Sequence, residues 1–315
     1  MGTVDVRKTA ERLGSQIGSV FVGDGGIVHN LLIGFFSGLH VLIEDIPGVG
    51  KTTLAMSLAR STGLDFGRIQ FTPDILPGDI LGMTVWSAEM REFIFKPGAV
   101  MHQFILADEI NRASARTQSS LLEAMQEEAV TVDGVTHHLP RPFFVIATQN
   151  PTSFAGTFLL PESQADRFGL SFSIGYPGVE NEVLILDRFK EKNPLDELAP
   201  VSDADEVNAV RELVGRVYVD RRVKDFLVKI AATTRQDPRI KLGLSPRGTR
   251  HLLRAAQCEA LLTGRDFVIP EDIMRTAPVV VPHRIVLSGE AKVENMSAIA
   301  MVQEVLSRIP LPTGV

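Results

Sequence analysis

Residues 41–60, VLIEDIPGVGKTTLAMSLAR, contain the pattern that decides the fold. A short apolar run, Val41–Ile43, leads into a glycine-rich loop, and a helical run, Leu54–Arg60, follows the loop directly. Glycines let a loop wrap closely around phosphate groups, and the N-terminus of the following helix supplies N–H groups and positive potential. A strand, such a loop and a helix in this order therefore predict a phosphate-binding loop.

Two residues of this loop have predicted contacts of their own. Lys51 is expected to reach the β- and γ-phosphates of ATP, and the Thr52 hydroxyl is expected to bind Mg²⁺. Asp45 stands where the pattern G-x-x-x-x-G-K-[ST] has its first glycine, and a short polar residue is tolerable there because the position only begins the loop. The other loop residues predicted to bind the nucleotide are Pro47, Gly48, Val49, Gly50 and Thr53.

Two further apolar runs end in polar residues. Phe104–Ala107 is followed by Asp108 and Glu109, and a carboxylate at the end of a strand beside the phosphate loop can hold the Mg²⁺ shell through water, a role we assign to Asp108. Glu109 is then placed to orient and deprotonate the attacking water. The run Phe143–Thr148 leads to Asn150, which is predicted to hydrogen-bond the γ-phosphate or that water, although an Asn before a proline is also a common turn residue.

Arg167 and Arg247 complete the set of candidate catalytic and binding residues. Arg167 precedes the last expected strand, and Arg247 lies at the start of an expected C-terminal helix. A guanidinium group stabilises the charge that spreads over phosphoryl oxygens in the transition state, and it can come from a neighbouring subunit. For either arginine taken alone, a surface ion pair is the default interpretation.

The hydrophobic pattern changes along the chain. Up to about residue 176, continuous apolar runs alternate with helical stretches, which indicates a parallel sheet covered on both faces. After Pro177 the period is helical, with one stripe formed by Val223, Phe226, Leu227, Ile230 and Ala231. We predict a core at residues 1–195 and an all-helical domain at residues 196–315, with a linker near Asn193–Val201. A capping box at Ser202 and Asp205 is expected to open one of the C-terminal helices. The expected strands are Leu39–Ile43, Ile69–Phe71, Phe104–Ala107, Phe143–Thr148 and Leu170–Ile174.

Composition narrows the class of protein. The 315 residues are 44% hydrophobic and 22% charged, which is typical of a globular chain. The N-terminus lacks the apolar core of a signal peptide, and no uncharged apolar stretch is long enough to cross a membrane. Cys258 is the single cysteine and is expected to be a buried structural thiol, which fits a reducing cytoplasm. The net charge of −6 does not favour nucleic acid as a partner.

In their order along the chain, these elements resemble the nucleotide-site set of AAA+ ATPases: Walker A, Walker B, sensor 1, arginine finger and sensor 2. Several strings narrow the resemblance to the MoxR family, and together they span roughly residues 20–285. They are TPDILPGDILG (72–82), ADEINRA (107–113), ATQNP (147–151), LPESQADRF (160–168) and VIPEDI (268–273).

The resemblance implies a fold, partners and further roles. It implies a P-loop core with a five-stranded parallel sheet, followed by a small helical lid. It also implies a homo-oligomeric, usually hexameric, ring that remodels client proteins, often with a von Willebrand factor A domain protein. Arg167 would be the finger acting in trans and Arg247 the sensor 2 residue, although Arg112 and Arg116 could also face a neighbouring subunit. Val22 and Gly23 would contact the adenine.

Two insertions in the core are predicted to be hairpins. Residues 83–100 and 129–139 each place strand-forming residues around a polar turn. In related ATPases such hairpins point to the central pore and touch the client, whereas the alternative is a structural ribbon without a contact role. His137 and His138 lie at the end of the second hairpin, and no acid or cysteine accompanies them at ligand spacing, so a metal site is not expected there.

The function predicted is Mg²⁺-dependent hydrolysis of ATP to ADP and phosphate, coupled to remodelling of a client protein. The main alternative is a nucleic-acid motor or loader, but the expected hairpins carry more acidic than basic residues. A scaffold that binds ATP without turnover would not need Glu109 or Arg167. A small-molecule kinase would not explain the helical domain that carries Arg247.

Overall fold

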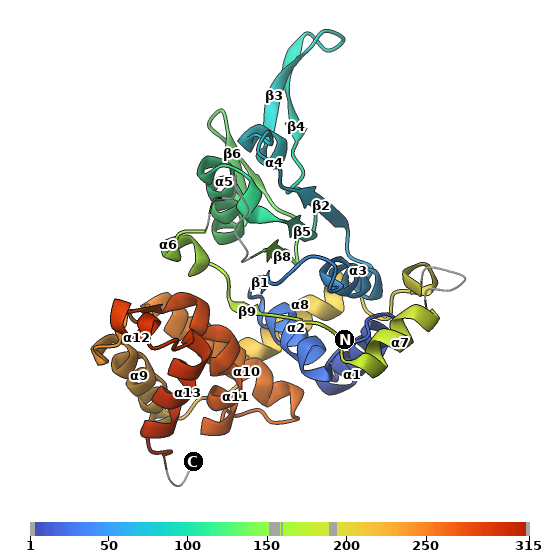
Figure 1. The fold of residues 1–315 in the computed structure, drawn as a ribbon. Coiled ribbons are helices and arrows are strands. Elements are labelled where there is room, and N and C mark those ends of the chain that lie inside the picture. The colour runs from blue at the N-terminus through green and yellow to red at the C-terminus, as the bar shows by residue number, and fades with distance from the viewer. Residues whose placement is uncertain (1–3, 151–157, 159, 189–193, 313–315) are drawn as a thin grey trace.

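The computed structural model describes residues 4–150, 158, 160–188 and 194–312. At its centre is a parallel sheet with the strand order β2-β5-β8-β1-β9 (Figure 1). Each strand overlaps one of the expected apolar runs, and all neighbours pair in parallel, so the predicted α/β core is confirmed. The strands are β1 (Val41–Glu44), β2 (Phe66–Gln70), β5 (Phe104–Asp108), β8 (Phe144–Gln149) and β9 (Leu170–Phe172).

Both faces of the sheet are covered by helices. Side chains alternate between two apolar layers along a strand, and in β1 Val41 and Ile43 belong to one layer and Leu42 to the other. The first layer is completed by α1, α2 and α3, and the second by α5, which explains why the strands are continuous apolar runs. These helices are α1 (Val6–Val20), α2 (Gly25–Ser37), α3 (Lys51–Thr62) and α5 (Ala115–Glu127).

The two predicted hairpins are confirmed. The first consists of β3 (Gly82–Ser87) and β4 (Glu92–Pro97), follows the short helix α4 (Pro77–Leu81) and projects away from the sheet (Figure 1). The second consists of β6 (Ala129–Val132) and β7 (Val135–His138), whose turn residues Asp133 and Gly134 both have positive φ. The rings of Phe95 and His137 stack with centroids 3.7 Å apart, so the two hairpins contact each other.

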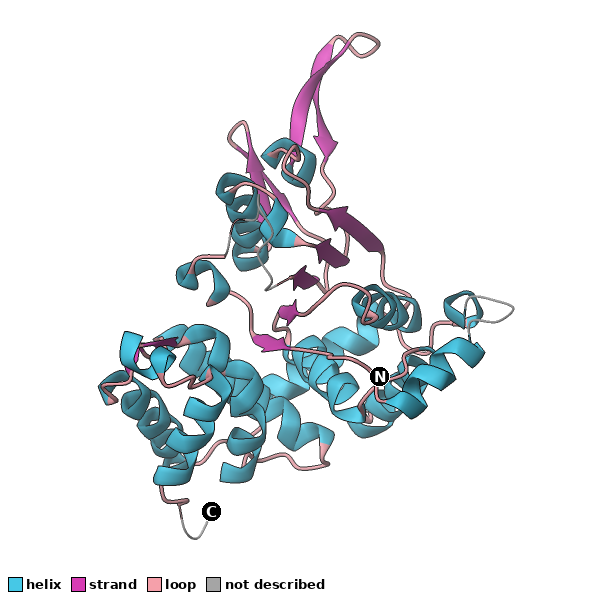
Figure 2. Cartoon of the chain, in the orientation of Figure 1, coloured by secondary structure: helices cyan, strands magenta, loops and turns pink. Residues whose placement is uncertain are grey.

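The C-terminal region is helical, as predicted, with one addition. The stripe from Val223 to Ala231 is buried along α9, as expected from its period. Between the helices, β10 (Ile240–Leu242) and β11 (Val286–Leu287) form a short antiparallel ladder that the sequence did not predict (Figure 2). The helices are α8 (Ala204–Arg216), α9 (Arg221–Gln236), α10 (Pro246–Leu262), α11 (Pro270–Val280), α12 (Gly289–Val293) and α13 (Ala298–Arg308), with 3₁₀ turns at Pro194–Glu197 and Pro282–Arg284.

The start of α8 corrects one detail. The helix is capped by Asp203, whose carboxylate accepts the N–H of Glu206 at 2.8 Å, so the predicted capping box at Ser202 and Asp205 is wrong by one residue. Asp is as good a cap as Ser, and spacing alone does not choose between adjacent candidates.

The core and the C-terminal helices share a continuous apolar layer. Val207 of α8 and Leu252 of α10 belong to the same cluster as Ile43 of the sheet. Polar contacts add to this layer: Nε2 of His29 lies 2.6 Å from a carboxylate oxygen of the fully buried Glu259 on α10. The division at residue 195 therefore stays a prediction, because buried contacts cross it on both sides.

Candidate nucleotide site

The phosphate loop has the conformation that its glycines were expected to allow. Gly48 and Gly50 have φ angles of +86° and +92°, in the left-handed region where a side chain would be strained. Helix α3 begins at Lys51 directly after Gly50, so its unpaired N–H groups face the loop. The loop therefore offers an anion a set of backbone donors at the end of β1.

A cavity of about 750 Å³ opens beside this loop, a size typical of a small-molecule site. Val22 and Gly23 line the cavity, as do Gly48, Val49, Gly50 and Thr53, so these candidate nucleotide-binding residues are brought together. Pro47, Lys51 and Thr52 are not among the lining residues. The preceding turn is closed by Asp24, which caps α2 through the N–H of Gly26 at 2.9 Å.

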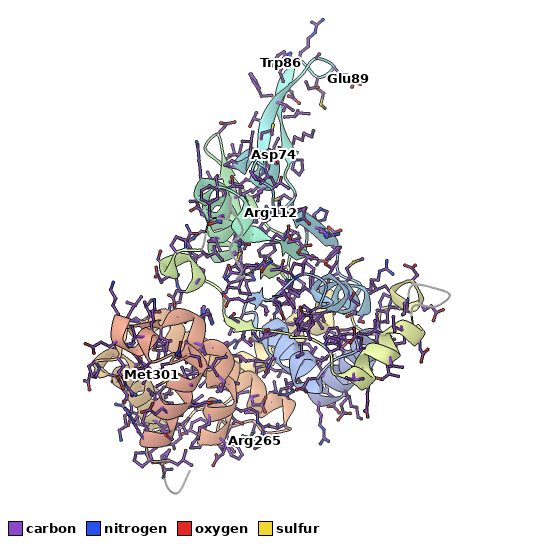
Figure 3. All side chains as sticks on the ribbon, viewed as in Figure 1. Asp74, Trp86, Glu89, Arg112, Arg265 and Met301 are labelled. Carbon is purple, nitrogen blue, oxygen red and sulfur yellow. The ribbon has the colours of Figure 1, made fainter. Side chains whose placement is uncertain are left out.

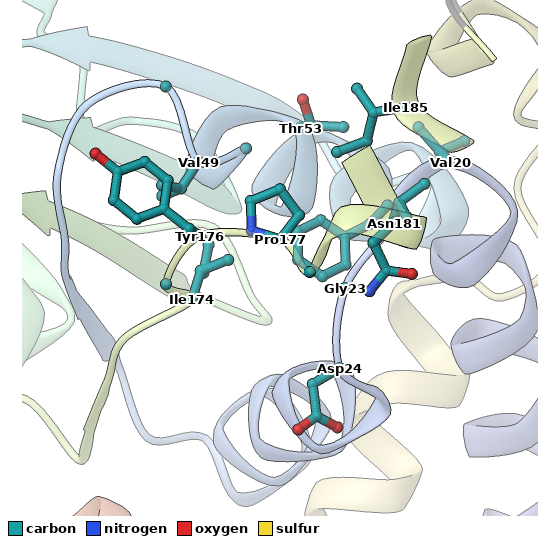
Figure 4. Close-up of a pocket in the computed structure, with 16 residues that line it drawn as sticks. Val20, Gly23, Asp24, Val49, Thr53, Ile174, Tyr176, Pro177, Asn181 and Ile185 are labelled. Atoms are coloured by element: carbon teal, nitrogen blue, oxygen red, sulfur yellow. The ribbon is translucent and has the colours of Figure 1, made fainter. Parts of the chain in front are cut away.

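The opposite wall of the cavity was missed by sequence reasoning. It is formed by the segment 174–178 and by helix α7 (Val179–Arg188), with Tyr176, Pro177, Asn181 and Ile185 around the opening (Figure 4). No recognisable pattern marks these residues, since they reach the cavity only because β9 lies next to β1 in the sheet. The cavity thus lies between the phosphate loop and a wall that follows the last strand.

Lys51 points its ammonium group back into the loop. Its Nζ donates to the backbone carbonyls of Asp45 at 2.6 Å and Ile46 at 3.0 Å. Partial burial lowers the pKa of Lys51, while the charges of Asp45, Asp108 and Glu109 act in the opposite direction. The ammonium group lies within the field of the acids at the end of β5.

Asp108 is fixed by two neighbours. Its Oδ1 accepts the hydroxyl of Thr148 on β8 at 2.6 Å, and its Oδ2 accepts a guanidinium N–H of Arg68 on β2 at 2.7 Å. Thr148 and Arg68 come from the strands on either side of β5, which explains why no local pattern predicted them. The carboxylate is therefore held at the carboxyl edge of the sheet, where the sequence placed it.

Glu109 adopts a strained backbone conformation. Its φ of +55° is unusual for a residue with a side chain and costs about 1–3 kcal/mol. The strain is offset by the hydroxyl of Thr148, which accepts the N–H of Glu109 at 2.9 Å. The Glu109 carboxylate accepts hydrogen bonds from Gln70 and Arg112, each at 3.0 Å. Polar partners from β2 and from the turn after β5 therefore hold the carboxylate of Glu109.

Asn150 follows β8 at the same edge of the sheet. Its backbone carbonyl accepts the side-chain N–H of the buried Asn111 at 3.1 Å, which ties the end of β8 to the turn after β5. Asn150 is therefore at the edge where the acids and the phosphate loop also lie. Its contact with phosphate or water stays a prediction.

The oxygen donors at this edge fit Mg²⁺. Thr52 lies in the first turn of α3 and Asp108 is the last residue of β5, and hydroxyl and carboxylate oxygens are the hard ligands that this ion prefers. Within the described residues no group of three or more His, Cys, Asp or Glu side chains could hold a metal ion. In a typical Mg²⁺ site, one or two side chains share the ion with phosphate oxygens and water.

Arg167 and Arg247 lie together, but not at this cavity. Both line a second cavity of about 360 Å³ between the core and the helical region, and neither lines the first. The reason is a set of contacts at Asp166, which accepts the hydroxyl of Ser245 at 2.9 Å and pairs with the buried Arg284 at 3.1 Å. These contacts place the residue before Arg167 against the start of α10, which carries Arg247.

Arginines outnumber acids in the lining of the second cavity, where Glu128 is paired with Arg141. Arg250 also lines it, and within the described part of the chain Arg167 and Arg250 have no ion-pair partner, while Arg247 donates one hydrogen bond to Gln126 at 3.2 Å. Burial, with the charge of Arg284, lowers the pKa of His251 to about 3, so this lining residue is neutral at pH 7. Of the alternative arginines, Arg112 pairs with Glu109 of its own chain, and Arg116 is exposed on α5.

Comparison with known proteins identifies the family. The family model described as "ATPase family associated with various cellular activities (AAA)" matches residues 40–170, and the AAA lid domain model matches residues 232–305. Chaperone MoxR1 of Mycobacterium tuberculosis is 37% identical over 313 residues, which cover 96% of this chain and 82% of that protein. The chain belongs to the MoxR family of AAA+ ATPases. Protein MoxR of Methylorubrum extorquens is 28% identical, over 98% of this MoxR-family chain and 96% of that one.

Two other comparisons support the family and the fold. The uncharacterized protein YeaC of Bacillus subtilis is 46% identical to this MoxR-family chain over 297 residues, which cover 94% of this chain and 93% of that protein. The crystal structure of a protein assigned as an ATPase from Cytophaga hutchinsonii superimposes with a TM-score of 0.89 at 35% identity, over 98% of this chain and 96% of that one. The predicted core and helical lid are thus confirmed. In the described part of the MoxR-family protein, no helix is long and apolar enough to cross a membrane.

Proposed function

We propose that this protein hydrolyses ATP to ADP and phosphate with Mg²⁺. The observation that carries the proposal is the placement of Asp108 and Glu109 at the end of β5, within the electrostatic reach of Lys51 in the phosphate loop. Lys51 and the N–H groups of the loop would bind the β- and γ-phosphates. Thr52 and Asp108 would hold Mg²⁺, which when bound neutralises charge on the phosphate oxygens.

Glu109 would act as the general base. It would accept a proton from water as the water oxygen attacks the γ-phosphorus and the bond to the β-phosphate oxygen breaks, which releases ADP. Its present partners, Gln70 and Arg112, must then release the carboxylate or share it with the water. Asn150 would hydrogen-bond the γ-phosphate or the water from the end of β8.

We further propose that the catalytic site is completed by a second copy of the chain. No arginine is among the described residues that line the nucleotide cavity, whereas the second cavity carries Arg167 and Arg247. A neighbouring subunit could bring both to the γ-phosphate, and repetition of that contact would generate the ring, hexameric by family resemblance.

Helix α7 supports assembly at this place. It borders the nucleotide cavity with Asn181 and Ile185, but it has no buried residue, and its side chains Val183 and Leu186 are 53% and 67% exposed. Glu180 and Glu182 on the same helix are also exposed and complement the charge of the arginine cavity. We propose that this face contacts the neighbouring subunit that supplies the arginines.

Assembly and activity should therefore rise together with protein concentration. Leu186→Glu should prevent ring formation and lower ATP hydrolysis at least about tenfold, because a charge would be buried without a partner at the contact. Nucleotide binding to the monomer should remain. Light scattering and ATPase assays on the same samples measure both effects, with Val293→Glu, a more exposed apolar site on α12, as the control. Equal specific activity of monomers and assemblies would refute the ring mechanism.

We propose that the first hairpin touches the client. Trp86 and Phe93 are 56% and 70% exposed and their rings lie 5.2 Å apart, and Figure 3 shows Trp86 and Glu89 near the end of the hairpin, far from the sheet. A pair of exposed aromatic side chains suits a protein client. The charges of this hairpin are balanced, with Glu89 and Glu92 against Arg91 and Lys96, and a nucleic-acid motor would need a basic surface there. A von Willebrand factor A domain partner remains a proposal from the family resemblance. A cytoplasmic location remains a proposal from the single cysteine, Cys258.

Trp86→Ser combined with Phe93→Ser should leave ATP hydrolysis within about twofold of the unmodified protein, since neither residue approaches the nucleotide cavity. The double variant should lose protection of a thermally unfolded reporter, citrate synthase, measured as light scattering during aggregation. Val135→Ser on the second hairpin is the control for a general loss of exposed apolar surface. Undiminished protection by the double variant would favour a structural ribbon.

A further inference from the structure

Asp45, at the start of the phosphate loop, makes more contacts than expected for a residue that only replaces the glycine of the general pattern. Asp45 is only 6% exposed, and its carboxylate accepts four hydrogen bonds. One comes from the N–H of Ile46 within the loop, at 2.8 Å. The other three converge on Oδ2 and come from the hydroxyl of Ser173 at 2.9 Å and the N–H groups of Ile174 at 2.6 Å and Gly175 at 2.7 Å.

Two of the three donors on Oδ2, Ile174 and Gly175, belong to the opposite wall of the nucleotide cavity, and Ser173 directly precedes it. All three follow β9, and the next residues, Tyr176 and Pro177, line the cavity before α7 begins at Val179. Gly175 turns the chain with a φ of +72°. A glycine at position 45 would leave two backbone N–H groups and a hydroxyl without this acceptor.

The same residue also contacts the predicted catalytic lysine. The backbone carbonyl of Asp45 accepts the ammonium of Lys51 at 2.6 Å. Burial acts to raise the pKa of the Asp45 carboxyl, but its hydrogen bonds outweigh burial and the pKa is lowered, so the group is an anion at neutral pH. The backbone of Asp45 thus contacts the lysine of the phosphate loop, and its side chain contacts the wall at 174–178.

We propose that Asp45 is a positioning residue that ties the phosphate loop to the wall at 174–178, so that the affinity for a whole adenine nucleotide depends on it more than the affinity for phosphates alone. The inference rests on the proposed nucleotide site. This wall continues into α7, the helix at the proposed subunit contact. Phosphate binding would therefore affect the position of α7 through Asp45.

The test compares two ligands that share only their phosphate chain. Binding of ADP with Mg²⁺ and of inorganic tripolyphosphate with Mg²⁺ is measured by calorimetry on the full chain. Asp45→Gly restores the glycine of the general phosphate-loop pattern and removes the three hydrogen bonds at Oδ2. Because these bonds hold the wall and not the phosphates, ADP binding should weaken by about tenfold or more. Tripolyphosphate binding should change by less than about threefold. Asp45→Asn should lie in between, because one amide oxygen can still accept the donors of the wall.

Controls separate this proposal from the proposed function. Glu44→Gln alters the neighbouring acid, which accepts a hydrogen bond from Gln149 and none from the wall, and should leave both affinities unchanged. If Asp45→Gly does not fold, as judged by circular dichroism, Asp45→Asn and Ser173→Ala must still reduce the ADP affinity selectively. Equal losses for both ligands, or none, would overturn the role of Asp45. Failure of the unmodified protein to bind either ligand would instead overturn the nucleotide site.

Discussion

Replacement of Glu109 by glutamine is expected to slow ATP hydrolysis by about 10²–10⁴-fold, the range typical for loss of a general base. Glutamine has nearly the same shape and can keep a contact with Gln70, but it cannot accept a proton from the attacking water. Binding of ATP should remain within about threefold, because Glu109 is not one of the phosphate ligands. Single-turnover hydrolysis and nucleotide affinity, measured on the same preparation, separate the two effects.

Glu123→Gln is the matched control, since it neutralises an exposed acid on α5, the helix that follows the Glu109 turn. It should hydrolyse ATP at the rate of the unmodified protein. If Glu109→Gln retained more than about a tenth of the activity, another group would have to activate the water, and the assignment of Glu109 would be wrong.

Replacement of Arg167 by alanine is expected to reduce turnover by about 10³-fold or more, the effect typical of a trans-acting arginine. The guanidinium has no ion-pair partner in the described chain and lines a cavity separate from the nucleotide cavity, so the loss should come from the neighbouring subunit's site. The assembly should keep its mass. Arg247→Ala is also expected to lower the rate of ATP hydrolysis, because Arg247 lines the same cavity as Arg167.

Mixing two inactive variants distinguishes action in trans from action in cis. Arg167→Ala keeps its phosphate loop, and Lys51→Ala keeps its arginines, so a mixed ring contains some complete sites and should regain a measurable part of the activity. Arg216→Ala, on the surface of α8, is the control for a general loss of charge. If mixing restored nothing, and Arg112→Ala or Arg116→Ala were inactive instead, the trans arginine would be one of those two.

Much of the fold could be predicted because its signals are local. The strands are continuous apolar runs, the hairpins carry their own turn residues, and the stripe on α9 repeats with the helical period. The two-residue strand β11 and its partner β10 were missed, since so short a ladder forms only in its tertiary setting, where α9 packs against β10. The cap of α8 was misplaced for the opposite reason, because several local candidates stood side by side.

The candidate nucleotide site also has a part that could be predicted and a part that could not. By itself, the sequence determined the phosphate loop, the two acids after β5 and the two candidate arginines, because each belongs to a short contiguous pattern whose chemistry depends on nearest neighbours. Only the tertiary structure decided that Arg68, Gln70 and Thr148 hold those acids, that Asp45 reaches the wall after β9, and that the arginines share a cavity away from the nucleotide. These contacts join residues from different strands and helices, and the order of strands in a sheet is set by packing of the whole chain.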